Sequence, residues 1–384
     1  MNRATLRAAL GLFLLLQGSL LLLASGRART VDEHSLHFMA ESLAAGRGVE
    51  VPQLMAIGSF YGKIGRNGKP YAPYSPGQPL LASLYLRALG PAFAAAATRE
   101  SGEPLLLARE AASTLLNTTV VAACAALFLM ALRIMGVPLT TALGSSLALV
   151  AATPLAVYAK SGFSEPLLAC FLCGALVGLA WFDSCDGSDP RGLWLAGISA
   201  AAAIGVKFAV GGLMAGALVL ALIASPARSL RALLRLAVFP LAAGLLHLFW
   251  NLERFGSVWD LGYPEAAEMG RRLNDFDTPA ALGLFGLLLS PGKGLAFFAP
   301  PILVSLAFFP LVRKRSPLAA IASAAFFALC LVLYSKYSAW EGGYCFGPRY
   351  LLPAVPGLML GLPFAMASSR RKAAIVACAL GLLV

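Results

Sequence analysis

Residues 30–43 read TVDEHSLHFMAESL and follow shortly after a Leu-rich apolar run near the N-terminus. They open a long polar segment that closes with NGKPYAPYSPGQPLL, residues 67–81. An adjacent acidic pair, Asp32 and Glu33, stands at the front of this segment, and a basic stretch rich in proline and tyrosine leads back to the next apolar run. We interpret the segment as an outward loop that carries a catalytic carboxylate and is held in place by the remaining helices.

The composition of the chain is that of a membrane protein. Of its 384 residues, 59% are hydrophobic and only 12% are charged, whereas a soluble domain carries about 25% charged residues. Apolar runs long enough to cross a bilayer, roughly 18 to 20 residues, recur along the whole length. The sequence therefore predicts an all-α polytopic membrane protein with about 11 transmembrane helices and interfacial helices in a large first loop.

Basic residues set the orientation of these predicted spans. Arg3 and Arg7 precede the Leu-rich run 10–23, and this basic start places the N-terminus inside by the positive-inside rule. The chain ends within an apolar run that begins at Ala373 and is too short to span, so we expect a further helix there to be incomplete. The predicted spans are about 6–24, 111–132, 138–157, 166–183, 191–206, 208–224, 232–250, 295–312, 317–336 and 350–367.

The stretch 78–97 is long enough to cross, but it contains Arg87 and a Gly90-Pro91 break. If it does not cross, the basic runs 313–315 and 370–372 fall inside, as the positive-inside rule requires. If it crosses, both runs fall outside. We therefore predict that 78–97 is an interfacial or re-entrant helix.

This count gives a single transmembrane domain, 1–384. The loops that contain unusual polar residues all lie on its outer face. The first extracytoplasmic loop is predicted over 27–110 and a second large extracytoplasmic segment over 251–294. The net charge of +12 does not indicate nucleic acid, because most basic residues flank apolar spans. Cys170 and Cys173 lie inside a span and are interpreted as buried, inert thiols.

Asp32 has two interpretations. It could cap a helix over about 33–45, since aspartate is a favoured N-cap residue. Alternatively, an amphipathic helix on the membrane surface could hold Asp32 at the interface as a general base. His34 and His37 follow and could bind a metal with an acidic neighbour, although no strong metal motif is present.

Basic residues near the membrane surface are candidate anion ligands. Lys69 and Tyr74 stand among prolines and glycines and could be a phosphate contact and an aromatic anchor, or parts of a rigid loop. Lys160 and Glu165 flank a bend, and Glu165 directly precedes Pro166, so it lies near a helix start. Either could be an ordinary helix-end charge or could line a cavity.

Two glycine-rich turns complete the candidates. The stretch LSPGKG, residues 289–294, offers Lys293 beside glycines that permit close backbone approach, and it lacks Walker A spacing. The stretch WEGGYCFGPRY begins at Trp340 and ends with Arg349-Tyr350. Its aromatic residues could belong to an interfacial belt, but three glycines and an arginine favour a shaped pocket with an anion ligand.

At these residues the sequence resembles the GT-C superfamily of membrane glycosyltransferases, in the branch that contains protein O-mannosyltransferases and the aminoarabinose transferase ArnT. Asp32-Glu33 matches the Asp-Glu pair at the start of the first outer loop in that branch. The Gly68-Lys69-Pro70 stretch, the acidic position at Glu165 and the stretch 340–350 are similar as well. The chain has glutamate at 165 where many relatives have aspartate, and it is shorter at its C-terminal end.

The resemblance implies a lipid-carrier-dependent hexosyl- or pentosyltransferase that inverts the anomeric carbon at the outer leaflet, with Asp32 as general base. It implies a polyprenyl-phosphate sugar donor, a lipid, glycan or protein acceptor, and a place in a bacterial inner membrane, serving the cell envelope. Glu33 and Glu165 would orient the acceptor or sugar, or share a divalent metal if one is used. The donor phosphate would contact Lys69, Lys293 and Arg349, and the substrate pocket would contain His34, Tyr74, Lys160, Trp340, Glu341 and Tyr344.

A transporter or lipid flippase is the main alternative, because the composition fits it equally well. Such a protein would carry polar residues near the middle of the membrane and internal repeats. The sequence shows no clear repeat, and its unusual residues gather at the ends of spans.

Overall fold

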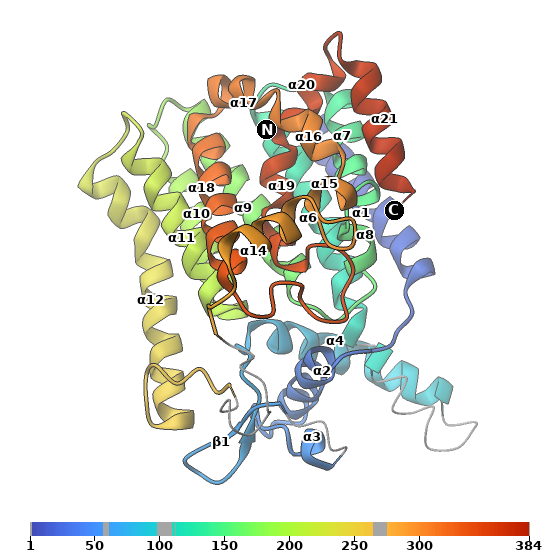
Figure 1. Ribbon diagram of the computed structural model, residues 1–384, viewed down its shortest axis with the longest axis vertical. Coiled ribbons are helices and arrows are strands. Elements are labelled where there is room, and N and C mark those ends of the chain that lie inside the picture. Colours follow the sequence, from blue (N-terminus) through green and yellow to red (C-terminus); the bar gives the residue numbers. More distant parts are fainter. Residues whose placement is uncertain (1, 57–60, 98–109, 112, 264–274, 384) are drawn as a thin grey trace.

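The computed structural model describes residues 2–56, 61–97, 110–111, 113–263 and 275–383. Helices dominate these residues, and the strands described are the short antiparallel pair β1 (Lys63–Ile64) and β2 (Pro70–Tyr71). Figure 1 shows a bundle of helices along the long axis, with a smaller group of elements from the first loop across one end. The predicted all-α polytopic membrane fold is confirmed.

Six helical segments are long and apolar enough to cross a membrane, judged by length and composition over the described residues. Each coincides with a predicted span. They are α1 (Arg3–Leu23), α6 (Leu116–Ile134), α9 (Glu165–Ser184), α12 (Leu230–Phe255), α18 (Pro317–Lys336) and the segment Arg349–Met366.

Shorter helices occupy the other predicted spans, and prolines explain most of the breaks. The span predicted over 138–157 stops as α7 at Ala151, because Pro154 follows, and the span 295–312 is broken at Pro300-Pro301 and again before Pro310. The prediction of continuous helices was wrong there. The elements concerned are α7 (Leu139–Ala151), α8 (Leu155–Tyr158), α10 (Arg191–Val206), α11 (Phe208–Ile223), α15 (Leu295–Phe298), α16 (Pro301–Leu306), α17 (Phe309–Arg315) and α21 (Arg371–Leu382).

The segment Arg349–Met366 is itself irregular, because prolines at 353, 356 and 363 interrupt its backbone hydrogen bonding. It is nevertheless the most buried of the six candidate spans. Its parts are η1 (Arg349–Ala354), α19 (Val355–Leu358), η2 (Met359–Gly361) and α20 (Leu362–Met366).

The first loop folds into elements of its own at one end of the bundle (Figure 1). They are α2 (Val31–Ala44), α3 (Pro52–Ala56), the two strands and α4 (Gly77–Ala97). Thr30 caps α2: its hydroxyl accepts a hydrogen bond from the amide of Glu33, whose side chain accepts one from the amide of Thr30. The alternative that Asp32 is the N-cap was therefore wrong, and its carboxylate is left free for other contacts.

The second polar segment, predicted over 251–294, contains more helix than expected. Helix α12 continues to Phe255, where Gly256 adopts a left-handed conformation and ends it, and α14 (Ala280–Leu288) precedes the Lys293 turn. Figure 1 shows α14 lying over the face of the bundle near α18.

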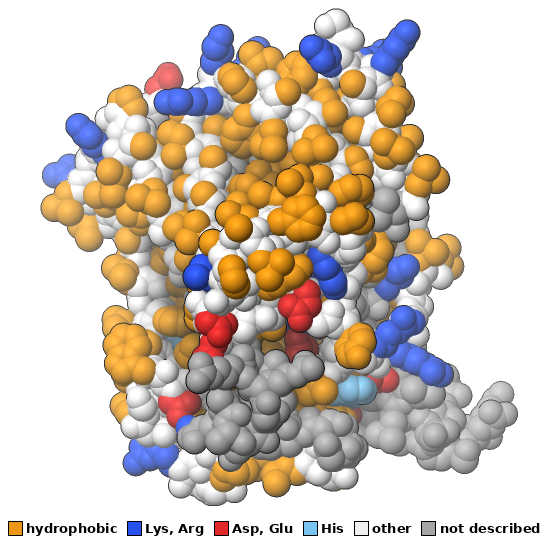
Figure 2. Space-filling model, viewed as in Figure 1, with side chains coloured by type: hydrophobic (Ala, Val, Ile, Leu, Met, Phe, Trp, Pro, Cys, Tyr) orange, Lys and Arg blue, Asp and Glu red, His pale blue; other side chains and the backbone are white. Residues whose placement is uncertain are grey.

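Helix α9 forms the centre of the bundle, packed between α6, α10 and the Arg349–Met366 segment. The outer helices α1 and α12 keep many leucines exposed, as expected where lipid replaces water. Figure 2 shows hydrophobic side chains over the middle of the visible face and Lys and Arg gathered at the end where α17 and α21 lie.

Candidate active site

The centre of the candidate site is the guanidinium of Arg349, which joins two carboxylates that are far apart in the sequence. Its Nη2 donates to Oδ2 of Asp32 at 2.7 Å, and its Nε donates to Oε1 of Glu165 at 3.0 Å. Asp32 lies in the first turn of α2, Glu165 begins α9, and Arg349 begins η1. The structure therefore brings together three residues that the sequence singled out separately.

Lys207 completes this central cluster of Asp32, Glu165, Lys207 and Arg349. It occupies the extended residue between α10 and α11, and its Nζ donates to Oε1 of Glu165 at 3.1 Å. The sequence analysis missed Lys207. A single lysine between two apolar runs was the available signal, because ionisable residues at such depth usually serve a function.

Burial makes the charge balance of the central cluster important. The side chain of Glu165 is 1% exposed and that of Arg349 is 8% exposed, whereas Asp32 keeps 29%. Two carboxylates and two cations compensate each other, and removal of one partner from such a buried pair typically costs about 3–5 kcal/mol. Asp32 is therefore the more accessible of the two acids.

The second oxygen of Asp32 is also occupied. The Tyr74 hydroxyl donates to Oδ1 at 2.6 Å. Burial and the Asp32 carboxylate raise the pKa of Tyr74 well above its usual range, so the hydroxyl stays a neutral donor. Tyr74, predicted from its place in the proline-rich stretch, thus helps to fix the orientation of the carboxylate.

Three elements hold the loop that precedes Glu165. Oε1 of Glu33 accepts from the amide of Gly162 at 2.7 Å. Gln78 of α4 donates to the carbonyl of Gly162, also at 2.7 Å. Asn117 of α6 donates to the carbonyls of Ser161 and Phe163 at 2.6 and 2.7 Å. These contacts fix α9 relative to α2, and they position Glu165 and Asp32 around Arg349.

Glu33 consequently has a different environment from the one the sequence analysis predicted. Its Oε2 accepts from the amides of Arg29 and Thr30 at 2.9 and 3.1 Å, in addition to the Gly162 contact of Oε1. The carboxylate is 3% exposed and satisfied by backbone donors. We therefore propose a positioning role for Glu33 in place of the predicted catalytic one.

An aromatic cavity of about 260 Å³ opens beside the central cluster. Burial raises the pKa of Tyr337 to about 12 and raises that of Tyr263 as well, so these hydroxyls remain neutral hydrogen-bonding groups. Apolar rings with hydroxyl tips suit a ligand that presents both a ring face and hydroxyl groups. The cavity is lined by Asp32, Lys207 and Arg349 of the central cluster and by aromatic residues that include Tyr74, Phe208, Tyr263, Phe276, Tyr334, Tyr337 and Tyr350.

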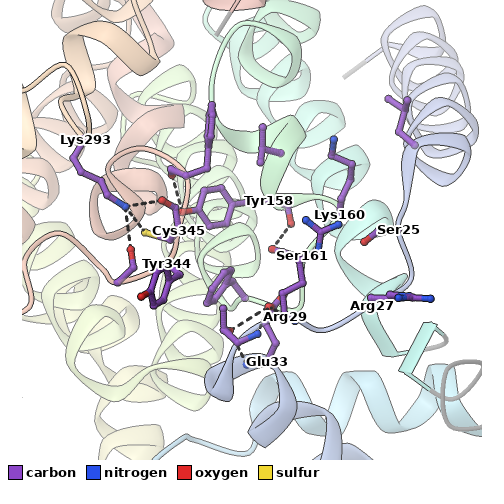
Figure 3. Close-up of a pocket in the computed structure, with 16 residues that line it drawn as sticks. Ser25, Arg27, Arg29, Glu33, Tyr158, Lys160, Ser161, Lys293, Tyr344 and Cys345 are labelled. Atoms are coloured by element: carbon purple, nitrogen blue, oxygen red, sulfur yellow. Dashed lines mark hydrogen bonds between the residues drawn. The ribbon is translucent and has the colours of Figure 1, made fainter. Parts of the chain in front are cut away.

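A second, basic cavity of about 750 Å³ lies on the other side of Arg349. The Phe163 ring lines this cavity, and Cζ of Arg349 lies 3.9 Å from the centroid of that ring. Figure 3 shows Lys160, Lys293, Arg27 and Arg29 around this cavity, with Glu33 at one side. Lys160, Lys293 and Tyr344 were predicted for the site, whereas Arg27 and Arg29 were not.

The Lys293 ammonium is fixed by the loop that leads to Arg349. It donates to the carbonyls of Gly343 and Cys345 at 3.2 and 2.6 Å (Figure 3). The Tyr158 hydroxyl donates to the carbonyl of Phe346 at 2.8 Å and fixes the same loop from α8. Both glycine-rich turns that the sequence singled out thus meet at one wall of the basic cavity.

Four other predicted site residues lie outside both cavities. Lys69 pairs with Glu50 at an exposed position, which raises the pKa of Lys69, so the structure does not bring it to the predicted phosphate site. The His34 ring nitrogen Nδ1 lies 3.5 Å from Oε1 of Glu110, away from the central cluster. Trp340 packs against Gly286 of α14, and Glu341 is exposed.

The histidines do not converge on a metal-binding arrangement. Nδ1 of His37 is 2.8 Å from the Ser113 hydroxyl, which in turn donates to the carbonyl of Glu110, whereas His34 contacts the Glu110 carboxylate. Among the described residues, no group of three His, Cys, Asp or Glu side chains could hold a metal ion.

Comparison with known proteins finds a similar fold but no similar sequence. No family model and no curated protein sequence matches the chain. The crystal structure of ArnT from Cupriavidus metallidurans bound to undecaprenyl phosphate superposes on 99% of this chain with a TM-score of 0.60 and 16% sequence identity. The chain has an ArnT-like fold. It spans 64% of the length of that ArnT.

The ArnT-like fold explains why distant residues meet. The start of α2, the start of α9, the α10–α11 junction and the start of η1 all lie at the end of the bundle that the first loop covers (Figure 1). The central cluster and both cavities are built at that end. In this structure, the charged side chains of the central cluster lie where helices begin or end.

Proposed function

We propose that this chain is an integral membrane glycosyltransferase that moves a sugar from a polyprenyl-phosphate donor to an acceptor hydroxyl. The observation that carries the proposal is Arg349 bridging Asp32 and Glu165 beside two cavities in an ArnT-like fold. The ArnT with that fold was crystallised with undecaprenyl phosphate, a lipid of the proposed donor class.

In the proposed reaction Asp32 is the general base. It takes the proton of the acceptor hydroxyl as the oxygen attacks the anomeric carbon from the face opposite the lipid phosphate. The bond between that carbon and the phosphate oxygen breaks, its electron pair stays on the phosphate, and polyprenyl phosphate leaves. The configuration at the anomeric carbon is inverted.

Binding of the donor would also release the base. Arg349 and Tyr74 occupy both oxygens of Asp32 in the free protein. An incoming phosphate competes for the Arg349 guanidinium, because arginine binds two phosphate oxygens in a favourable planar geometry. Transfer of Arg349 from Oδ2 to the phosphate would leave that oxygen available for the acceptor proton.

Arg349 and Lys207 are the proposed cations for the leaving phosphate. Both line the aromatic cavity and are anchored by Glu165, so they are oriented before the substrate arrives. The sugar would occupy the aromatic cavity, where tyrosine rings and hydroxyls match its faces and hydroxyl groups. Lys69, the phosphate ligand suggested by sequence, is replaced in this role by Lys207.

We further propose that this end of the molecule faces outward from the plasma membrane of a bacterium. The loop-covered end carries the central cluster, while α17 and α21, with their basic residues, lie at the other end (Figures 1 and 2). The positive-inside rule puts that basic end in the cytoplasm.

The Asp32→Asn substitution tests the general base. It keeps the shape of the side chain and the Tyr74 hydrogen bond but removes the proton-accepting charge. Transfer of radiolabelled sugar from a polyprenyl-phosphate donor in proteoliposomes should fall by about 10²–10⁴-fold. The protein should stay folded, with a lower melting temperature because buried Arg349 loses one of its two carboxylate partners.

Asp189→Asn is the matched control, because Asp189 has a similar side-chain exposure of 26% and lies at the opposite end of α10 from Lys207. It should transfer sugar at the wild-type rate. A fully active Asp32→Asn protein would remove Asp32 from the role of base.

A further inference from the structure

His247 is a buried histidine on the membrane helix α12, and it lines the aromatic cavity. It is 8% exposed, whereas Leu245, Leu246 and Phe249 on the same helix are exposed. It lies about 12 Å along the helix axis from the end of α12 at Phe255. An ionisable residue at such depth usually faces the protein interior and serves a function.

Two aromatic rings fix the orientation of the His247 ring. The Phe208 ring stacks on it, with 4.5 Å between the centroids and an interplanar angle of 9°, and the Trp250 centroid lies at 5.7 Å with an angle of 69°. Phe208 directly follows Lys207, so the stack also fixes His247 relative to the central cluster. Stacking uses a face of the imidazole and leaves its nitrogen-bearing edge for hydrogen bonds.

The side of the cavity that carries Tyr74 is tied to the same stack. Cζ of Arg254 lies 3.5 Å from the centroid of the Trp250 ring, and its Nη1 donates to the carbonyl of Ala72 at 3.2 Å. Ala72 lies two residues before Tyr74 in the chain. His247 is therefore held in a fixed place in the cavity before a ligand arrives.

The ring nitrogens of His247 have no hydrogen-bond partner among the described residues. A buried polar group without a partner is destabilising unless a ligand compensates it. A neutral imidazole offers one donor and one acceptor, and a hydroxyl group can pair with either. The position thus suits a ligand that carries hydroxyl groups.

The volume of the cavity limits the size of that ligand. At about 260 Å³ it lies below the roughly 300–1,000 Å³ of pockets for drug-sized molecules, so it suits a single sugar ring. Under the proposed function, on which this inference rests, Arg349 and Lys207 take the donor phosphate. An apolar lipid chain would leave the imidazole nitrogens unpaired. The sugar is therefore the part of the donor that His247 can meet.

We propose that His247 is a specificity-determining residue that hydrogen-bonds one hydroxyl group of the donor sugar. Phe208 and Trp250 hold the imidazole in place, and its nitrogen-bearing edge selects sugars that present a hydroxyl toward it. A sugar without this hydroxyl leaves the imidazole unpaired and binds more weakly.

The test measures binding to the full chain in phosphatidylcholine nanodiscs by thermophoresis. The probes are undecaprenyl phosphate and undecaprenyl phosphate that carries glucose, galactose, mannose or arabinose. The sugar that binds most tightly is then compared with its deoxy analogues, each with one hydroxyl replaced by hydrogen.

Three variants accompany the wild type. His247→Phe keeps an aromatic ring for the stack and removes both nitrogens. His247→Gln restores a donor and an acceptor. The control Leu246→Phe places the same new ring at the adjacent, exposed position of α12.

Wild type should bind at least one sugar-bearing probe more tightly than undecaprenyl phosphate. His247→Phe should bind that probe about fivefold to tenfold more weakly, the scale of one lost hydrogen bond, and undecaprenyl phosphate within twofold of wild type, which shows that it is folded. One deoxy analogue should lose the same factor with wild type but not with His247→Phe. His247→Gln should recover part of the loss, and Leu246→Phe should bind every probe as wild type does.

The proposal is wrong if His247→Phe binds the sugar-bearing probe as tightly as wild type, or if it loses undecaprenyl phosphate to the same extent. It is also wrong if wild type prefers none of the sugar-bearing probes, because the cavity would then not be a sugar site. Sugar transfer is measured separately. A wild type that distinguishes sugars in binding but transfers none would overturn the proposed function and leave the His247 contact standing.

Discussion

At the scale of single residues, the site is organised by Arg349 rather than by a carboxylate. One guanidinium orients Asp32 and Glu165 at the same time, and its planar fork makes this geometry specific in a way that a lysine could not reproduce. Tyr74 then donates to the other oxygen of Asp32, and Lys207 donates to the same Oε1 of Glu165 that Arg349 contacts. The resulting network holds the four charged side chains in a fixed mutual geometry.

Glu33 gives the clearest prediction at this scale. Glu33→Ala would leave the amides of Arg29, Thr30 and Gly162 without their acceptor, and each buried unsatisfied group costs about 1–3 kcal/mol. We expect a clearly lower melting temperature together with slower transfer, because the loop before Glu165 loses its contact with α2. Nanodisc thermal unfolding and the transfer assay measure the two effects.

Glu50→Ala is the comparison for that substitution, because Glu50 contacts the exposed Lys69 and such a pair is screened by solvent. Its melting temperature should stay near that of wild type. If Glu33→Ala kept full stability and lost only transfer, Glu33 would act on the substrate and the positioning role would be wrong.

At the scale of elements, the antiparallel pair α9 and α10 places the anchor of the site. Helix α9 begins with Glu165 and α10 ends just before Lys207, so close packing of the two helices brings those side chains together. The approach depends on glycine: a Cβ on Gly178 would collide with the carbonyl of Gly192 and the amide of Ala196. Small residues allow this kind of contact between membrane helices.

Gly178→Ala should therefore force α9 and α10 apart. Overpacking of this kind costs about 1–3 kcal/mol, and the shift should also weaken the contact between Glu165 and Lys207. We expect a lower melting temperature and reduced transfer. Gly216→Ala on α11 meets open space and should leave both unchanged; equal behaviour of the two variants would contradict the packing argument.

At the scale of the whole molecule, charge is distributed in layers. Figure 2 shows hydrophobic side chains across the middle and most of the visible acidic side chains toward the end that the first loop covers. Basic side chains lie at the end that carries α17 and α21 and also toward the loop-covered end. Helix α4 packs on α2 at that same end. This arrangement supports the prediction that 78–97 is interfacial.

Reporter insertions test this orientation. A reporter active only in the cytoplasm should work at Ser369, before α21, and should be silent at Gly68, in the exposed turn between β1 and β2. It should also be silent at Glu100, which lies outside the described residues. Activity at Glu100 with silence at Gly68 would mean that α4 crosses the membrane.

Much of the fold was predictable because apolar span length is a local property of the sequence. The six long helical segments match predicted spans, whereas breaks at Pro154, Pro300 and Pro310 were missed although the prolines were visible. The Thr30-x-x-Glu33 capping box was also readable and went unrecognised. These errors concerned helix ends, where short-range hydrogen bonds decide the outcome.

The candidate site was predictable only in part. Unusual residue types in a membrane chain pointed to Asp32, Glu165, Arg349 and Lys293, since ionisable groups near a bilayer are costly and are retained for a purpose. Sequence could not tell which of them meet, and it assigned Lys69 to a phosphate and Glu33 to chemistry. Lys69 binds Glu50, and Glu33 binds backbone amides, because long-range packing decides which partner is in reach.

By itself, the sequence determined that this is a membrane protein of apolar helices with polar residues at their ends, because hydrophobicity and proline act over a few turns. Only the tertiary structure decided that residues 32, 165, 207 and 349 form one cluster and that the other cations surround a separate cavity. The physical reason is that electrostatic compensation depends on distance in space, which helix packing sets and the order of residues does not.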